Sequence, residues 1–133
     1  MVICAGGGGV PTTVDPATGR ITGVEAVIDK DRTSAVLALD LGADRLVIAT
    51  DVPAVYEQWG TDAARAMATA HPDDLDPMTF PSGSMGPKIA VASLFARSSK
   101  GDAVIGALDD LAGLLAGEAG TLVSTSRVGV TYR

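Results

Sequence analysis

Short apolar runs recur along this chain between segments rich in glycine, proline and aspartate. Continuous apolar runs without polar alternation are typical of strands that are covered on both faces in a parallel sheet. We predict such strands at 2–5, 45–50, 103–106 and 121–123. Apolar stretches ended by glycine or a polar segment predict helices at about 31–41, 88–98 and 108–115. Because strands and helices alternate, we expect an α/β domain with a largely parallel sheet.

The segments between these elements carry turn signals. Residues 11–23 place an Asp-Pro-Ala-Thr-Gly turn between two β-like stretches, which predicts an exposed hairpin. Residues 55–59 fit a loop or one helical turn, and the alanine-rich segment 61–70 favours a helix that breaks at 71–74. Residues 80–87 are expected to form a turn-rich loop, with Pro87 in the first turn of the helix that follows.

Composition and charge narrow the functional classes. Hydrophobic residues make up 47% of the chain and aromatic residues 4%, so the core must be built from small aliphatic side chains. A formal charge of −6 argues against a nucleic-acid partner. With one cysteine and one histidine we expect no disulfide and no zinc site, and the absence of a long apolar run argues against a membrane span. These features favour a cytoplasmic protein.

Glycines and charged residues at element ends supply the candidate chemistry. Four glycines at 6–9 follow the first predicted strand, where backbone N–H groups could surround an anion, although a tight turn explains them equally well. They match neither a Walker A loop nor a dinucleotide fingerprint. The acids of Asp29-Lys30-Asp31 suit a helix N-terminus, but Lys30 opposes the helix dipole unless an anion lies nearby.

Two further groups of residues stand where ligands commonly bind. The segment 83–88 would deliver Lys88 to a helix start, as a phosphoryl-transfer site requires, although most lysines are solvated surface residues. Thr50, Asp51 and Val52, with Tyr56, lie at the carboxyl end of a predicted parallel strand, the usual ligand edge of an open α/β sheet, although capping or packing would explain them equally well. The remaining unusual residues, Cys4, Trp59 and His71, are interpreted as structural.

Four segments taken together resemble the carbamate kinases. They read AGGGGVP at 5–11, GVEAVIDKD at 23–31, TDVPAVY at 50–56 and GSMGPK at 83–88, and the likeness extends from about residue 2 to residue 123. Carbamate kinases belong to the amino acid kinase superfamily, whose fold is a three-layer α/β/α sandwich around a mostly parallel sheet. The resemblance therefore implies a nucleotide-binding domain at 1–123 with this fold, corresponding to the C-terminal half of the family. It leaves 124–133 as a tail or an edge strand.

The resemblance also implies ligands and roles. ATP or ADP with Mg²⁺ would exchange a phosphoryl group with carbamate or carbamoyl phosphate. Lys88 would neutralise the transferring group, Asp31 would organise the lysines and the metal, and Lys30 would contact a phosphate. The implied nucleotide pocket comprises Thr50, Asp51, Val52, Tyr56, Ser84, Met85 and Gly86. The loop that lines the reaction centre comprises Gly7, Gly8 and Gly9.

The chain departs from the family because the N-terminal half of the carbamate kinases, which carries the carbamoyl-phosphate loops, does not precede Met1. We therefore expect weak or no kinase activity from this chain alone, and a complementary N-terminal half or a second copy as a partner at the exposed edge of the first strand. The competing hypothesis is a non-catalytic ADP- or ATP-binding or assembly module derived from an amino acid kinase. A uridylate or acylglutamate kinase fits GVEAVIDKD and GSMGPK less well.

Overall fold

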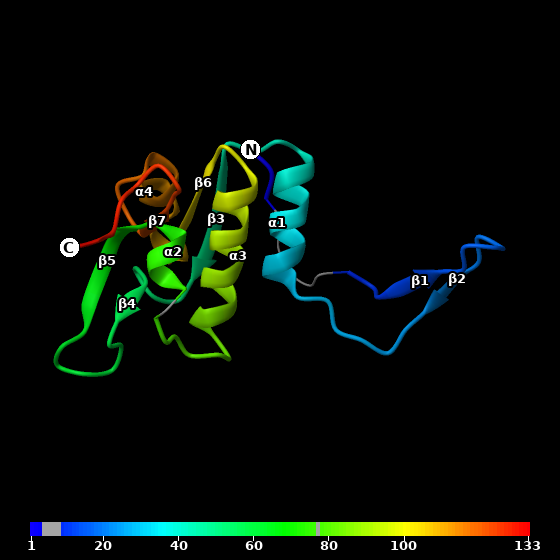
Figure 1. Ribbon diagram of the computed structural model, residues 1–133, viewed down its shortest axis with the longest axis horizontal. Helices are drawn as coiled ribbons and strands as arrows, with labels where there is room; N and C mark the ends of the chain where they lie inside the picture. The colour runs from blue at the N-terminus through cyan, green and yellow to red at the C-terminus, as the bar shows by residue number, and fades with distance from the viewer. Residues whose placement is uncertain (4–8, 77) are drawn as a thin grey trace.

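The centre of the fold is a six-stranded sheet with the strand order β3-β6-β7-β5-β4, and β8 pairs with β5 (Figure 1). The computed structural model describes residues 1–3, 9–76 and 78–133. The strands of this sheet are β3 (Arg45–Thr50), β4 (Tyr56–Glu57), β5 (Arg65–Ala70), β6 (Asp102–Ala107), β7 (Thr121–Val123) and β8 (Val130–Tyr132).

The pairing within the sheet is mixed. β3 and β6 form a parallel ladder from Arg45 opposite Asp102 to Thr50 opposite Ala107, as their unbroken apolar sequences predict. β5 and β7 are also parallel, whereas β6–β7, β4–β5 and β5–β8 are antiparallel. The α/β class is confirmed, but the sheet is mixed and not largely parallel as expected, because three of its five described strand pairings are antiparallel.

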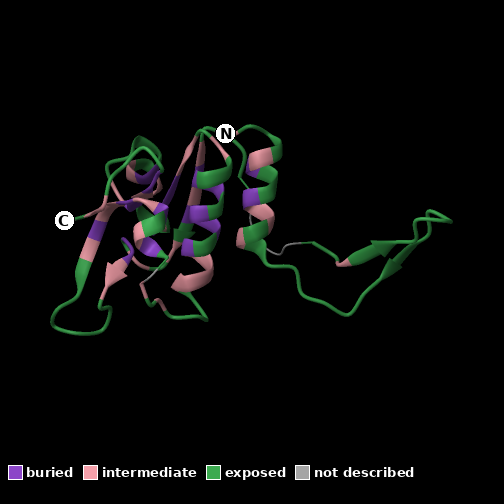
Figure 2. Cartoon of the chain, viewed as in Figure 1, coloured by how far each residue is buried: buried purple, intermediate pink, exposed green. Residues whose placement is uncertain are grey.

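Helices cover both faces of the sheet. They are α1 (Lys30–Asp40), α2 (Pro72–Leu75), α3 (Met85–Ser98) and α4 (Leu111–Ala116), with a 3₁₀ turn, η1 (Leu108–Asp110), before α4. On the face covered by α1 and α3, Ile48 and Ile105 of the sheet share one buried cluster with Phe95 of α3 (Figure 2). On the other face, Leu114 of α4 and Val104 of β6 are fully buried. Neighbouring residues along β6 thus face opposite layers.

A two-stranded hairpin extends away from this body (Figure 1). β1 (Thr12–Val14) and β2 (Ile21–Gly23) pair antiparallel, and every residue of both strands is exposed. The Asp15 carboxylate closes the connecting turn by accepting hydrogen bonds from the amides of Ala17 and Thr18, both at 2.8 Å. The exposed hairpin expected from the sequence is confirmed.

The helix expected at 61–70 is wrong, because residues 65–70 form β5. Alanine favours a helix in isolation, but here the segment lies between three partner strands whose ladders satisfy its backbone. The loop or helical turn expected at 55–59 contains the two-residue strand β4 for the same reason. Tertiary pairing has overridden local propensity in both segments.

Three other boundaries differ from the sequence prediction. Val2 and Ile3 are exposed and outside any strand, and the remaining residues of the expected first strand, Cys4 and Ala5, lie outside the described residues. Val2 and Ile3 have no strand partner among the described residues, and a buried strand requires one. α3 begins at Met85 and not at Lys88, and the break at 71–74 contains the short helix α2, with His71 as its N-cap. No helix among the described residues has the length and apolar character to cross a membrane.

We predict that Gly106→Ala lowers the free energy of unfolding by about 1–3 kcal/mol. A Cβ atom at Gly106 would lie 2.5 Å from Leu114 Cδ2 and 2.8 Å from Gly120 Cα, so α4 could not keep its distance from the sheet. Urea unfolding of both proteins measures the change, with Gly23→Ala as the control because nothing lies within 4 Å of its added methyl group. Equal losses in the two variants would contradict this account of the packing.

Candidate active site

An ion pair joins the first turns of α1 and α3. Lys88 Nζ lies 3.1 Å from Asp31 Oδ2, and the two side chains are only 16% and 13% exposed. Lys30 Nζ lies 3.8 Å from the other oxygen of the same carboxylate, on a side chain that is 59% exposed. One carboxylate therefore holds two cations. These three residues, Asp31, Lys30 and Lys88, are the ones that the family resemblance assigns to catalysis.

The two helices begin differently. Asp29 caps α1 in the usual way, because its carboxylate accepts a hydrogen bond of 2.7 Å from the Arg32 amide. No side chain caps α3 at Ser84, and the first turn of α3 contains no acid. An uncapped helix N-terminus with a lysine in its first turns favours a negatively charged ligand.

The loop before α3 is held by its own backbone. The Pro81 carbonyl accepts hydrogen bonds from the Ser84 amide at 3.3 Å and from the Gly86 amide at 2.9 Å. Gly86 packs closely against this turn, since a Cβ atom there would lie 3.2 Å from the same carbonyl, which would have to shift by a few tenths of an ångström. This tight turn joins the 80–82 segment to the helix that carries Lys88.

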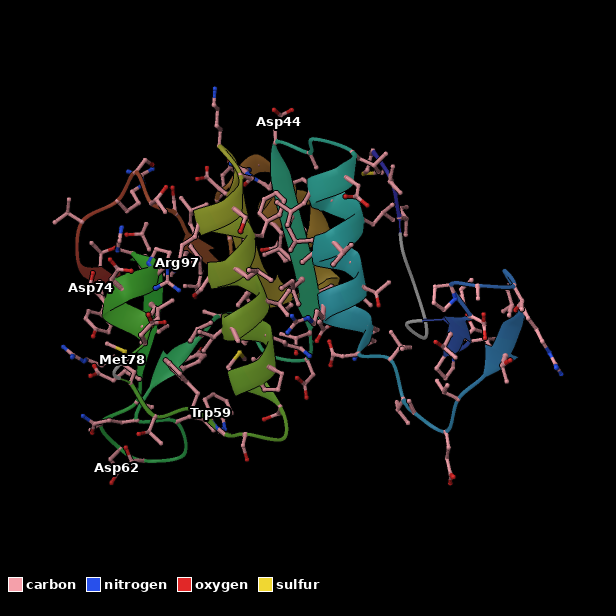
Figure 3. The ribbon with its side chains drawn as sticks, turned by 45° about the vertical axis from the view of Figure 1, so that its right-hand side comes forward. Asp44, Trp59, Asp62, Asp74, Met78 and Arg97 are labelled. Atoms are coloured by element: carbon pink, nitrogen blue, oxygen red, sulfur yellow. The ribbon has the colours of Figure 1, made fainter. Side chains whose placement is uncertain are left out.

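The carboxyl end of β3 lies at the same edge of the sheet. Asp44, which directly precedes β3, lies at the opposite end of the sheet from Trp59 (Figure 3), so β3 runs toward the start of α3. At the end of the strand, the Thr50 hydroxyl donates a 3.0 Å hydrogen bond to the Asp51 carboxylate. Ligands of open α/β sheets bind beyond such carboxyl ends.

An aromatic cavity of about 350 Å³ opens at this edge. Its lining residues are Tyr56, Gln58, Trp59, Thr79, Phe80 and Pro81. The rings of Tyr56 and Trp59 are tilted by 59° with their centroids 4.8 Å apart. Because Pro81 belongs both to the cavity and to the turn before α3, the cavity borders the segment that leads into the helix carrying Lys88.

Buried hydrogen bonds fix the strand that bears Tyr56. The Thr121 hydroxyl accepts from the Val55 amide at 2.9 Å and donates to the Met67 carbonyl at 2.7 Å, and all three residues are fully or almost fully buried. Thr121 lies on β7, Met67 lies on β5, and Val55 directly precedes β4. This hydroxyl therefore holds together the segments behind the cavity.

A polar cluster fixes the outer side of the same strand. The Glu57 carboxylate accepts hydrogen bonds from the Arg65 guanidinium and, at 2.8 Å, from the Tyr132 hydroxyl. The Arg65 guanidinium lies 3.9 Å from the centre of the Tyr132 ring. The bond from Arg65, and then that from Tyr132, lowers the pKa of Glu57 below its ordinary value of 4.5. β4, β5 and β8 are thus linked through side chains as well as backbone.

The structure brings most of the sequence-predicted residues to this edge. Met85 and Gly86 form the first turn of α3, whereas the sequence prediction placed them in a loop. Val52 follows Asp51 and is half-buried. Gly9 is exposed, with a φ of 109° and nothing within 4 Å of the position of its missing side chain. Gly7 and Gly8 lie outside the described residues.

Sequence reasoning missed part of the cavity. It interpreted Trp59 as a packing residue, yet 57% of Trp59 is exposed and its ring lines the cavity. It also did not select Gln58, Thr79, Phe80 or Pro81 as individual site residues. The Tyr-Glu-Gln-Trp sequence at 56–59 was the available signal, because an aromatic pair beside a turn is costly to expose unless a ligand covers it. The described residues contain no cluster of three or more metal-ligating side chains.

Known proteins share this sequence and this fold. Residues 1–107 match the model of the family described as "Amino acid kinase family". The carbamate kinase of Haemophilus influenzae is 47% identical over 132 residues, which are 99% of this chain and 42% of that protein. The carbamate kinase of Escherichia coli K12 is 52% identical over 93% of this chain and 40% of that protein.

A solved structure gives the same result. The carbamate kinase from Giardia lamblia bound to AMP-PNP superimposes with a TM-score of 0.81 at 30% identity, covering 88% of this chain and 42% of that chain. The chain thus spans about two fifths of the length of the relatives it matches. The sequence comparisons and the superposition of structures therefore point to the same group of proteins.

We predict that Thr121→Val destabilises the protein by about 2–4 kcal/mol, since valine keeps the shape of threonine but leaves the Val55 amide and the Met67 carbonyl buried without this partner. Thr121→Ser, which retains the hydroxyl, is the matched control. Chemical unfolding monitored by circular dichroism measures both variants. A valine variant as stable as the serine variant would show that the hydroxyl does not link these strands.

We also predict that Glu57→Gln lowers the melting temperature at pH 7 but not in strong acid. The folded pKa of Glu57 lies below its unfolded value, so its contribution is present above about pH 4.5 and is lost as the pH falls through the folded pKa. Thermal unfolding of wild-type protein and variant from pH 7 to pH 3 should show two melting curves that converge on acidification. A constant difference across this range would assign the effect to packing.

Proposed function

Because this chain belongs to the amino acid kinase family, we propose that it supplies the nucleotide-binding side of a carbamate kinase-type phosphotransferase. The reaction would transfer a phosphoryl group between ATP or ADP and carbamate or carbamoyl phosphate. The observation that carries the proposal is the half-buried Lys88–Asp31 pair beside the uncapped start of α3, next to an aromatic cavity. The relatives named carbamate kinase support the choice of acceptor.

The proposed roles follow from what each group can do. The base would enter the cavity between Tyr56 and Pro81, and the phosphates would extend toward the first turn of α3. Lys88 Nζ has three N–H donors, of which the Asp31 carboxylate uses one, so two remain for phosphate oxygens. Lys30, on its exposed side chain, would reach a second phosphate oxygen. Charge neutralisation by preplaced cations is the main protein contribution to phosphoryl transfer.

Mg²⁺ fits this site only together with the nucleotide. The described residues offer no cluster of three acids, and Asp31 is already engaged by two lysines. Magnesium in kinase sites is commonly held by substrate phosphates with one or two carboxylates, and it neutralises charge that develops on them. Asp31 would therefore orient the lysines, with the metal arriving on the phosphates.

A second candidate function is a non-catalytic nucleotide-binding module. The chain spans about two fifths of the curated carbamate kinases, so any groups that the transfer site needs from the rest of those proteins would be missing from the matched region. A complementary N-terminal half or a second copy of the chain could supply them, and transfer would then need that partner. Nucleotide binding is common to both candidates, whereas turnover separates them.

The test begins with calorimetric titration of the purified chain with MgADP. Wild-type protein should bind, and Lys88→Ala should weaken binding by about tenfold to a hundredfold because it loses charge-assisted hydrogen bonds. Lys100→Ala, an exposed lysine beyond the other end of α3, is the matched control and should bind normally. Since Lys88→Ala leaves the poorly exposed Asp31 with only the more distant Lys30 as a partner, the double variant Lys88→Met/Asp31→Asn tests whether lost binding reflects lost folding.

ATP formation from MgADP and carbamoyl phosphate then separates the candidates. Binding without turnover, with turnover restored by an added N-terminal half of a carbamate kinase, supports the kinase proposal. Turnover by the chain alone would disprove its need for a partner. Binding that never leads to turnover favours the module, and absence of binding refutes both.

A further inference from the structure

Gln58 adopts a backbone conformation that glutamine normally avoids. Its φ is 54°, and no other residue except glycine has a positive φ in the described part of the chain. The left-handed region is unfavourable for residues with a Cβ atom, so it persists only where the surroundings hold it. Here the Gln58 carbonyl accepts from the Thr61 hydroxyl at 2.9 Å and from the Thr61 amide at 3.3 Å. The turn after β4 is thereby fixed with Gln58 at its bend.

This conformation places Gln58 among the cavity-lining residues, between Tyr56 and Trp59 in sequence. The cavity is walled mainly by rings, and Gln58 contributes its only side-chain amide. That amide forms no hydrogen bond with any described residue and Gln58 is exposed, whereas its backbone carbonyl accepts both hydrogen bonds from Thr61 in the turn. An amide offers a donor and an acceptor side by side in a fixed plane. A flat ligand that fills the cavity would present its edge to such a group.

We propose that Gln58 determines the base specificity of the nucleotide site, which rests on the function proposed above. Its amide N–H would donate to N1 of an adenine ring, and its carbonyl would accept from the adenine amino group at position 6. The paired donor and acceptor of a glutamine or asparagine amide recognise adenine in this way on its other edge as well. The turn fixes the Gln58 backbone beside the cavity, and the Tyr56 and Trp59 rings would supply the apolar contact.

The test replaces the amide by groups with a different hydrogen-bonding pattern. Gln58→Glu offers two acceptors, which suit the adjacent N1–H and amino donors of guanine and repel N1 of adenine. We expect the ratio of ADP affinity to GDP affinity to fall about tenfold in this variant, the value of one to two hydrogen bonds. Gln58→Gly keeps the left-handed turn without the amide and should bind both nucleotides with more similar affinity.

Fluorescence of Trp59, the only tryptophan of the chain, reports binding directly from the cavity wall. Each protein is titrated with MgADP and MgGDP, and circular dichroism checks folding. Ala64→Glu, which adds the same charge at an exposed position outside the cavity, is the control for general repulsion of phosphates. It should weaken both nucleotides alike and leave their ratio unchanged.

The outcomes separate this inference from the proposal on which it rests. A ratio that shifts toward GDP in Gln58→Glu but not in Ala64→Glu supports the role of Gln58. If wild-type protein binds MgADP and the ratio in Gln58→Glu equals that in Ala64→Glu, the role of Gln58 is refuted and the nucleotide site stands. If wild-type protein binds neither nucleotide, the nucleotide site itself is refuted, and the role of Gln58 with it.

Discussion

The ion pair between Lys88 and Asp31 is the contact on which the arrangement of the candidate site depends. It links the first turns of α1 and α3, two helices that lie far apart in the sequence and pack on the same face of the sheet. A pair this poorly exposed contributes little net stability, because desolvation of both charges offsets their attraction. Its consequence is geometric: the lysine is held at the carboxyl edge of the sheet, where a long flexible side chain would otherwise sample many positions.

The other features at this edge of the sheet also leave positive charge there. α3 begins without a side-chain cap, its preceding turn is closed by the Pro81 carbonyl, and Gly86 packs closely against that carbonyl. Each feature is unfavourable or neutral for an isolated helix, yet together they leave a positive helix end beside a fixed cation. Such local departures from the rules of stability are expected at functional sites and are compensated elsewhere.

The sequence predicted those parts whose signal is local. The apolar run 45–50 and the Asp29 cap each determine an element boundary by themselves, and they lie where expected. Lys88 and Asp31 were assigned through motif resemblance, and only the fold shows that they touch. The helix predicted at 61–70 is wrong because alanine carries no strand signal, whereas pairing with three partner strands imposes strand structure on 65–70. The interpretation of Trp59 as a packing residue missed the cavity, because Phe80 and Pro81, which line it with Trp59, are remote in sequence.

The wall of the cavity depends on the end of the chain, a dependence that no local motif reveals. Tyr56 and Glu57 lie on a strand of only two residues, too short to hold its own position. Thr121 fixes it from behind through the Val55 amide, and Tyr132 fixes it from outside through the Glu57 carboxylate. Both residues lie beyond 1–107, the part that matches the family model. Changes in these last strands should therefore alter the cavity through β4 without touching a ligand, so their effects on binding must be separated from those of Lys88.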